Sequence, residues 1–332
     1  MISQQTNYSK IEAMNGLNNR ECPKPINYWD RPFVSVIIPV FNDAKRLKIC
    51  LKALENQTYP QSLYEVIVID NDSDKIEDVQ DIVCQFGQAI ATYEKLPGSY
   101  AARNKGIALA KGEIIAFTDA DCIPSVNWIE EGVKNLLQVP NCGLVAGKIE
   151  IFFQNLSCIT PVELYESITA FPQKKLVEQH KYGATANLFT FQKVIERVGL
   201  FDATLKSNGD VEWGRRVNSF GYKLVYTDDA CVLHPARYSW KQLYIRTIRL
   251  AGGAYNLQTR QDNSFIRSNF IFLKNLIFDL TPPLMFVFHT FLDSRLQGLE
   301  QKIKVSLVMF FVRYVGAWEK LKLKTGATAS RE

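Results

Sequence analysis

A short apolar run that ends in two aspartates constrains this chain more than any other feature of its sequence. Ile114–Phe117 has the composition of a buried strand, and Asp119 and Asp121 follow it closely. Side chains two positions apart in extended chain point the same way. Paired carboxylates repel each other, and a divalent cation that prefers oxygen ligands relieves the repulsion and can clamp a diphosphate. The pattern favours such a metal site; the alternative is a loop in which Asp119 caps the next helix.

Two earlier apolar runs also end in polar clusters. Val34–Val40 is followed by Asn42 and Asp43, and Glu65–Ile69 is followed by D-N-D-S at 70–73. Helical patterns separate the runs, and this alternation predicts an α/β fold with a mostly parallel sheet and helices on both faces. In such sheets ligands bind at the carboxyl ends of the strands. The three clusters are therefore expected to form one binding site, although each alone could be a helix cap.

Local details complete this interpretation of the sheet. Pro39 is expected to end the pairing of the first strand, because proline has no N–H to donate. Asn42 or Asp43 is expected to cap the helix that follows. Lys223–Tyr226 and Ala230–Leu233 are predicted as two further strands.

Loops that bind phosphate through backbone amides are absent from the sequence. Neither G-x-G-x-x-G after the first strand nor G-x-x-x-x-G-K-[ST] occurs. A diphosphate would therefore be neutralised mainly by metal and side chains. Arg103, just upstream of the acidic strand, is placed to contribute; the alternative is a solvated arginine on a helix surface.

Composition and charge limit the functional classes. The 332 residues, 47% hydrophobic and 22% charged, suit one large domain or one domain plus an extension. A net charge of +5 is too small to indicate nucleic acid, but 239–324 carries thirteen Lys/Arg against five Asp/Glu. Seven cysteines without a C-x-x-C pair argue against disulfides and zinc and fit a reducing cytoplasm. The N-terminus has no apolar core, so no secretory signal is expected.

The ordered motifs resemble those of the family 2 glycosyltransferases, the large inverting group with the GT-A fold. The resemblance covers roughly residues 33–237. It implies a Rossmann-like GT-A domain over 32–237, a polar lead-in over 1–31 and a helical, basic and apolar C-terminal extension over 238–332. The motifs that carry it are V-S-V-I-I-P-V-F-N (34–42), V-I-V-I-D-N-D-S (66–73), A-R-N-K-G (102–106), G-E-I-I-A-F-T-D-A-D (112–121), A-N-L-F (186–189), V-G-L-F-D (198–202) and G-D-V-E-W-G-R-R (209–216).

The resemblance also implies which residues bind the donor nucleotide. Pro39, Val40 and Asn42, at the end of the first strand, are expected to cup it. Asp70 and Asn71 are expected to contact the base, where the family usually has two acids. An amide offers both a donor and an acceptor, so recognition of uracil, and hence a UDP-sugar donor, stays the expectation.

The paired aspartates match the D-x-D motif of the family. The resemblance implies that Asp119 contacts the ribose and that Asp119 and Asp121 hold Mg²⁺ or Mn²⁺ on the diphosphate, with Arg103 nearby. His234, at the end of a later strand, is expected to be a structural histidine, with a metal or phosphate role as the alternative.

The family's Glu-Asp pair, whose aspartate is the catalytic base, corresponds to Gly209 and Asp210. Asp210 is therefore the expected general base. Glu212 could orient Asp210 or the acceptor; the alternative is an ion pair with Arg215 or Arg216 on the same helix.

The implied reaction is inverting transfer of a single sugar, of hexosyltransferase type, from a nucleotide-diphosphate sugar to a hydroxyl acceptor. Cell-surface polysaccharide or glycolipid synthesis is the expected context. Processive synthases would carry Q/R-x-x-R-W and several spanning helices, and neither is found. A nucleotidyltransferase would have a Gly-rich loop after the first strand. A degenerate member that only binds nucleotide sugars or serves as a scaffold is disfavoured by the retention of Asp119, Asp121 and Asp210.

The C-terminal extension contains two apolar stretches, 276–292 and 305–312. Neither is a clean run of about twenty apolar residues, the length that a spanning helix needs. The stretches could pack on the catalytic domain or lie in a membrane interface, with basic residues on anionic headgroups. The interpretation favoured here is a cytoplasmic enzyme in peripheral contact with the inner face of the cell membrane, acting on a glycan or lipid-linked acceptor.

Overall fold

A computed structural model describes residues 31–74, 78–261 and 265–327 of the chain, so all but Arg31 of the polar lead-in predicted for 1–31 lies outside the described residues. The chain divides into two compact units. The first contains Met1–Glu150, Phe171–Ala203 and Asp210–His234, and the second contains Ile151–Ala170, Thr204–Gly209 and Pro235–Glu332.

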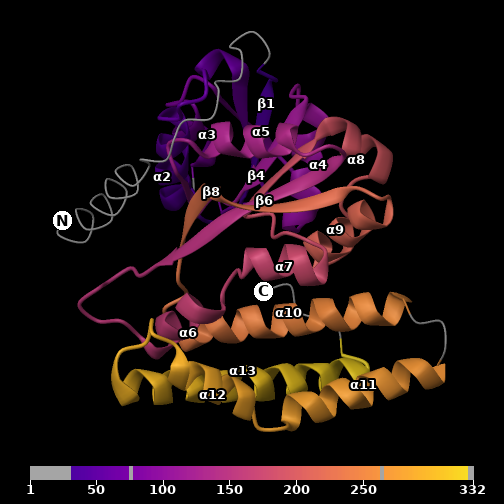
Figure 1. The fold of residues 1–332 in the computed structure, drawn as a ribbon. Helices are drawn as coiled ribbons and strands as arrows, with labels where there is room; N and C mark the ends of the chain where they lie inside the picture. The colour runs from indigo at the N-terminus through magenta and orange to yellow at the C-terminus, as the bar shows by residue number, and fades with distance from the viewer. Residues whose placement is uncertain (1–30, 75–77, 262–264, 328–332) are drawn as a thin grey trace. The chain divides into compact units, whose positions relative to one another are not determined.

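The first unit is built on a mixed sheet. The last residues of two of its strands, β6 and β8, are assigned to the second unit. Within the described residues its strand order is β3-β2-β1-β4-β7-β6-β8-β5 (Figure 1). Pairing is parallel among β1, β2, β3 and β4, and antiparallel where β7 meets β4 and β6 and where β5 meets β8. The predicted α/β architecture is therefore confirmed, with a parallel half and an antiparallel half. The strands are β1 (Val34–Val40), β2 (Tyr64–Asp70), β3 (Ala89–Tyr93), β4 (Ile114–Thr118), β5 (Ile123–Pro124), β6 (Cys142–Phe152), β7 (Asn187–Phe191) and β8 (Lys223–Pro235).

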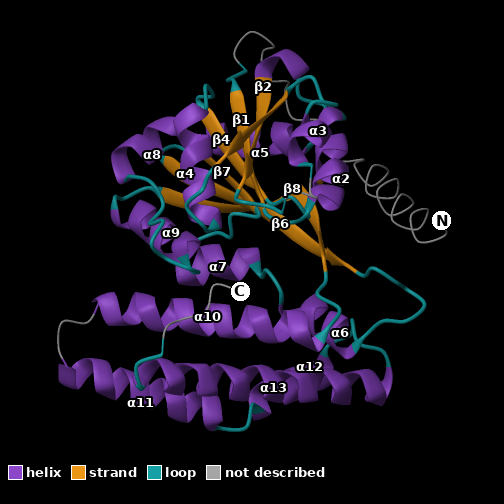
Figure 2. Ribbon diagram, turned by 180° about the vertical axis from the view of Figure 1, so that it is seen from behind, coloured by secondary structure: helices purple, strands orange, loops and turns teal. Residues whose placement is uncertain are grey.

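Helices cover both faces of this sheet, as the two views in Figures 1 and 2 show. Side chains alternate along each strand, so that Val36 and Ile38 pack on one face and Ile37 on the other. The face of Val36 is covered by α2 (Ala44–Glu55), α3 (Val79–Val83) and α5 (Trp128–Gln138). The face of Ile37 is covered by α4 (Ser99–Leu109), α7 (Gln173–His180), α8 (Gln192–Val198) and α9 (Gly209–Ser219). A short 3₁₀ turn, η2 (Gln61–Leu63), precedes β2.

Two local predictions about the strands are wrong. Pro39 does not end the pairing of β1, because β1 continues to Val40 beside β2, with Pro39 opposite Ile69. Pairing with β4 stops at Ile37, so the missing N–H of Pro39 interrupts no ladder on that side. The two strands predicted around 223–233 form one continuous strand, β8, because the polar residues between them stay extended.

The second unit is helical. Its helices are α6 (Pro161–Thr169), α10 (Trp240–Gln261), α11 (Phe265–Leu280), α12 (Leu284–Leu292) and α13 (Gly298–Lys324). The long α13 packs against all of the others, and an apolar core joins Val162 and Tyr165 of α6 to Leu243, Val305 and Val308. Additional helices after the sheet are thus confirmed.

In the described ranges, no helix of the second unit is on its own both long and apolar enough to cross a bilayer. Asn269–Leu280 and Leu284–Leu292 reach the necessary length and apolar composition only as a pair, and the pair is bent by 47° at the break.

Candidate active site

The first aspartate of the acidic pair is held by a buried arginine. Asp119 follows β4, and its Oδ1 lies 2.5 Å from Nη2 of Arg103 on α4. Arg103 is only 3% exposed, so the alternative of a solvated helix arginine is wrong. Asp119 is not a helix cap either, because α5 begins only after Asn127. This ion pair fixes the carboxylate at the carboxyl end of β4.

The second aspartate meets a histidine that arrives from the far end of the sequence. β5 runs antiparallel to β8, with Ile123 opposite Leu233. The pairing brings Cys122 and His234 beside Asp121, and one ligand atom from each of the three lies within 4.8 Å of the others. Nε2 of His234 is 3.6 Å from Oδ2 of Asp121.

These side chains fit a divalent cation. The Asp121 carboxylate, 22% exposed, offers oxygen, and His234 offers an imidazole nitrogen. Mn²⁺ accepts both kinds of ligand, whereas Mg²⁺ prefers oxygen. Cys122 offers sulfur, a soft ligand that suits Mg²⁺ and Mn²⁺ less well than oxygen does. Asp119 pairs with Arg103 through one oxygen and keeps a second. Asp121 and His234, with Asp119, are therefore the residues that could hold Mg²⁺ or Mn²⁺.

Arg46 connects the first strand end to this cluster. Its Nη2 lies 2.6 Å from Asp43 and its Nη1 lies 3.7 Å from Asp121. Asp43 occupies the N-cap position of α2, but its side chain makes no capping hydrogen bond. The predicted cap is wrong because this carboxylate pairs with Arg46 instead.

The ends of β1 and β2 are tied together through Asn42. Its N–H donates to the Ser73 hydroxyl at 2.9 Å, and its amide oxygen accepts from the Asp74 N–H at 2.7 Å. Asn42 has a φ of 50°, a left-handed conformation that asparagine tolerates. Pro39 and Val40 lie just before it, and the Val40 carbonyl accepts from the N–H of residue 71 at 2.9 Å. Three of the predicted nucleotide contacts thus share one corner of the sheet, and their role stays a prediction.

Asn71 organises the loop that follows β3. Its Nδ2 donates to the carbonyls of Glu94 and Leu96, at 2.8 and 2.9 Å. Its Oδ1 accepts from the N–H of Gly98 at 2.7 Å, and Gly98 supplies the positive φ of 124° from which α4 starts. Neighbouring Asp70 accepts from the N–H of Ser73 at 3.0 Å. Asp70 thus offers the carboxylate at this strand end, whereas Asn71 shapes the loop beside it.

Asp210 lies in the first turn of α9. The Tyr100 hydroxyl donates to its Oδ1 at 3.3 Å, and the N–H of Val211 donates to the same oxygen at 3.0 Å. Burial raises the pKa of Asp210 above that of an ordinary carboxyl, while these two hydrogen bonds and the charge of Arg103 hold it down. The side chain still keeps partial contact with solvent. A carboxylate in this setting can accept a proton from a bound hydroxyl.

Glu212 has a structural partner. It forms a two-oxygen ion pair with Arg216 on α9, at 2.8 and 2.9 Å. Arg216 also donates to the carbonyls of Val198 and Leu200, at 2.8 Å each. The predicted alternative, an ion pair on the same helix, is thus confirmed. Through its bonds to the two carbonyls, Arg216 also holds the segment around 198–200 against α9.

The structure links the candidate metal site at the end of β4 to the expected base. Arg103 pairs with Asp119, its guanidinium lies 5.8 Å from the ring centroid of Tyr100, and Tyr100 contacts Asp210. The sequence interpretation missed Tyr100 and gave His234 only a secondary role. The signal for Tyr100 was its place three residues before Arg103, which puts both on one face of a helix.

Comparison with known proteins identifies the family. Residues 35–199 match the profile of glycosyl transferase family 2. Glycosyltransferase AglE of Haloferax volcanii is 42% identical over 211 residues, which are 62% of this chain and 68% of that protein. The chain belongs to glycosyltransferase family 2. The predicted enzyme class is therefore confirmed.

Other similar proteins support the family 2 fold. The pre-mycofactocin glycosyltransferase of Mycobacterium tuberculosis is 26% identical over 72% of this chain, which spans 50% of that relative. The mannosyltransferase PcManGT of Pyrobaculum calidifontis, solved with GDP-Man and Mn²⁺, has a TM-score of 0.60 at 16% identity, over 98% of this chain and 96% of that one. GalNAc-T7, solved with UDP, GalNAc and Mn²⁺, has a TM-score of 0.50 at 19% identity, over 67% of this chain and 48% of that one. These likenesses confirm the GT-A fold.

Proposed function

We propose that this enzyme transfers one sugar, with inversion, from a nucleotide-diphosphate sugar to a hydroxyl acceptor. The observation that carries the proposal is the connected set Asp119, Arg103, Tyr100 and Asp210. It joins an acidic strand end suited to a metal-bound diphosphate with a carboxylate suited to deprotonating an alcohol. Both ends lie in one compact unit.

The proposed donor is a UDP-sugar. The Asp70 carboxylate, at the end of β2, accepts a hydrogen bond from the N–H of Ser73 and has capacity to accept others. Uracil presents an N–H that this carboxylate could accept. The nucleotides in the solved neighbours differ, GDP-Man in PcManGT and UDP in GalNAc-T7, so the fold alone does not select the base.

The proposed metal is Mn²⁺ or Mg²⁺, held by Asp121 and His234 with Asp119. When bound, such a cation offsets the negative charge of the leaving nucleoside diphosphate. Arg103 supplies a permanent positive charge at the same strand end. Both solved neighbours were determined with Mn²⁺, which supports the proposal.

Asp210 is the proposed general base. As the acceptor oxygen bonds to the anomeric carbon, its proton passes to the Asp210 carboxylate and the bond from that carbon to the diphosphate oxygen breaks. The nucleoside diphosphate leaves from the opposite face, so a single displacement inverts the anomeric centre. The Tyr100 hydroxyl orients the carboxylate through the hydrogen bond at 3.3 Å.

The acceptor is proposed to be a hydroxyl of a lipid-linked glycan, used in cell-surface polysaccharide or glycolipid synthesis at the cytoplasmic side of the membrane. A similar protein of Methanococcus voltae, 26% identical over 69% of this chain, is named for glucuronosyl transfer to a dolichyl N-acetylglucosaminyl phosphate. That name supports a lipid-linked acceptor. The nucleotidyltransferase alternative is set aside, because the chain belongs to a glycosyltransferase family. The scaffold alternative is set aside because Asp119, Asp121 and Asp210 are all retained.

A screen of nucleotide sugars for metal-dependent release of nucleoside diphosphate tests the function. One UDP-sugar should be hydrolysed or transferred in the presence of Mn²⁺ or Mg²⁺. Asp210→Asn should retain donor binding and lose about a hundred- to ten-thousand-fold in transfer rate, because the amide cannot accept the proton. Near wild-type turnover in this variant would exclude Asp210 as the base.

A further inference from the structure

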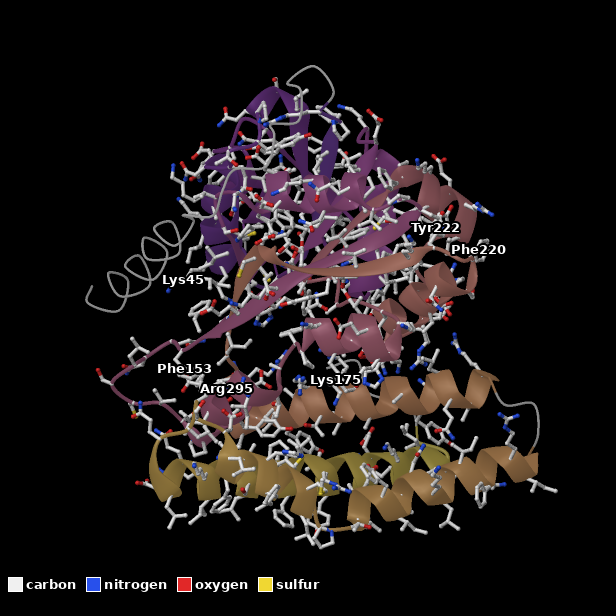
Figure 3. The ribbon with its side chains drawn as sticks, viewed as in Figure 1. Lys45, Phe153, Lys175, Phe220, Tyr222 and Arg295 are labelled. Atoms are coloured by element: carbon white, nitrogen blue, oxygen red, sulfur yellow. The ribbon has the colours of Figure 1, made fainter. Side chains whose placement is uncertain are left out.

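The second unit presents a continuous exposed apolar face. On α11 the exposed apolar residues other than Phe278 recur every three or four positions, which places them on one side of the helix, and α12 continues the pattern. We call these side chains the α11–α12 face. In Figure 3 the side chains drawn along both helices are mostly carbon. Its members are Ile266, Phe270, Leu273, Ile277, Phe278, Leu280, Leu284, Met285, Phe288, Phe291 and Leu292, exposed by 39 to 81%. A soluble monomer rarely leaves so many large apolar side chains in water.

The single acidic side chain among the described residues of α11 and α12 is paired with a lysine of α13. It belongs to Asp279, and Nζ of Lys320 lies 2.6 Å from its carboxylate. Arg313 donates to the Asp279 carbonyl at 3.2 Å and lies 4.6 Å from the ring centroid of Phe278. Lys274 is exposed beside the face. Over 265–327 the chain carries nine Lys/Arg against four Asp/Glu, so the surroundings are positive.

The break between the two helices carries few polar backbone groups that need water. Pro282 and Pro283 have no N–H to satisfy. The N–H and the hydroxyl of Thr281 donate to the Ile277 carbonyl, at 2.9 and 2.7 Å. At the end of α12, Lys302 donates to the Phe291 carbonyl at 2.6 Å. A chain segment in contact with lipid has to satisfy its backbone internally in this way.

We propose that the α11–α12 face lies in the headgroup and acyl boundary of one leaflet of an anionic bilayer. Exposed apolar side chains would enter the acyl region, and the surrounding lysines and arginines would meet anionic headgroups. The 16 residues of α11 reach about 24 Å, short of the roughly 30 Å hydrocarbon core, and the break bends the pair by 47°. Taken together the two helices are long and apolar enough to cross, so it is the bend at the break that leads us to place them along the surface rather than across the bilayer. This inference goes beyond the proposed reaction and does not depend on it.

Sedimentation of the full-length protein with vesicles tests the inference. Vesicles of phosphatidylcholine plus phosphatidylglycerol should carry the protein down, and pure phosphatidylcholine should carry down less. Leu284 and Met285 are 71 and 70% exposed, so Leu284→Asp combined with Met285→Asp removes little internal packing. The double variant should lower the partition coefficient at least about tenfold, because each apolar side chain that leaves the acyl region loses its transfer free energy.

Matched controls separate this effect from general charge and folding effects. Leu156, on a loop of the second unit, and Phe220, labelled in Figure 3 in the first unit, are 60 and 44% exposed. Leu156→Asp combined with Phe220→Asp adds the same two charges and should leave vesicle binding unchanged. Denaturant midpoints should agree among the three proteins. Sugar-nucleotide hydrolysis in solution, measured in parallel, reports on the proposed function separately.

Two outcomes would overturn the proposal. One is a full-length protein that ignores the anionic vesicles at low salt. The other is a dimer in light scattering that Leu284→Asp with Met285→Asp dissociates while vesicle binding is absent, which would assign the face to a second copy of this chain.

Discussion

At the scale of single residues, Tyr100 is one of the groups that set the charge state of the proposed base. Its hydroxyl donates to the ionised form of Asp210 and so lowers the pKa of that carboxyl, against the rise that burial causes. Tyr100→Phe removes the donor, and the pKa of Asp210 should rise further. Because the base acts only when ionised, the acidic limb of the pH profile of kcat/KM should move to higher pH. Tyr226→Phe, which removes a hydroxyl bonded to Asp228, is the control and should leave the profile in place.

The metal hypothesis is also tested at this scale. Donor binding should require Mg²⁺ or Mn²⁺, and Asp121→Ala should abolish the metal-dependent part by removing the carboxylate that adjoins His234. Calorimetric titration of UDP with and without the metal measures this. An unchanged affinity for nucleotide in excess EDTA would contradict the hypothesis.

At the scale of elements, the loop between β3 and α4 explains why this chain has Asn71 where its family usually has an acid. Two carbonyls, those of Glu94 and Leu96, face the side chain, and only an N–H donor satisfies them. Asn71→Asp would turn a carboxylate oxygen toward both. We expect a loss of about 1–3 kcal/mol in the free energy of unfolding, the cost of leaving buried polar groups unsatisfied.

Urea denaturation measures the effect of Asn71→Asp. Asn56→Asp serves as the control, because the Asn56 side chain donates to one carbonyl, that of Lys52, at the exposed end of α2. A drop in stability of equal size in both variants would show that the charge itself, rather than the loop, is responsible.

The sequence predicts where helices and strands lie along the chain better than it predicts which of them pack together. β1 covers the same residues, Val34–Val40, as the first apolar run, because that run is continuous and Asn42 and Asp43 follow it closely. The match of Asp210 to the family's catalytic aspartate follows from the motif alone. The meeting of Asp121 with His234 does not, because it depends on a two-residue strand, β5, that pairs with β8 more than a hundred positions later. Such a short strand has no periodicity from which it could be predicted.

At the scale of the whole molecule, the proposed membrane contact predicts a spectroscopic signal. Phe288 belongs to the α11–α12 face and is 59% exposed, so Phe288→Trp places an indole on that face. Binding to anionic vesicles should shift the emission of this variant to shorter wavelength, because the added indole leaves water. The unsubstituted protein, whose Trp128 and Trp213 are fully buried, should show a smaller shift. Equal shifts in the two proteins would mean that the added indole does not enter the bilayer.

Salt should separate the two contributions to vesicle binding. Raising the ionic strength from about 0.1 M to 1 M shortens the screening length from about 10 Å to 3 Å and weakens attraction between lysines and anionic headgroups. The apolar contribution persists, so we expect partial rather than complete release in a sedimentation series. Full release at 1 M salt would mean that the α11–α12 face does not enter the acyl region.

The apolar core shared by α6 and α13 bears on how such an enzyme can be inherited. Val162 and Tyr165 come from the middle of the chain, yet they pack with Val305 and Val308 near its end. A recombination event that exchanged only the residues after 237 would set an unmatched helix against α6. Substitutions on α6 and on α13 should therefore covary among descendants of this gene, and viable chimeras should carry 151–170 and the C-terminal helices from the same parent.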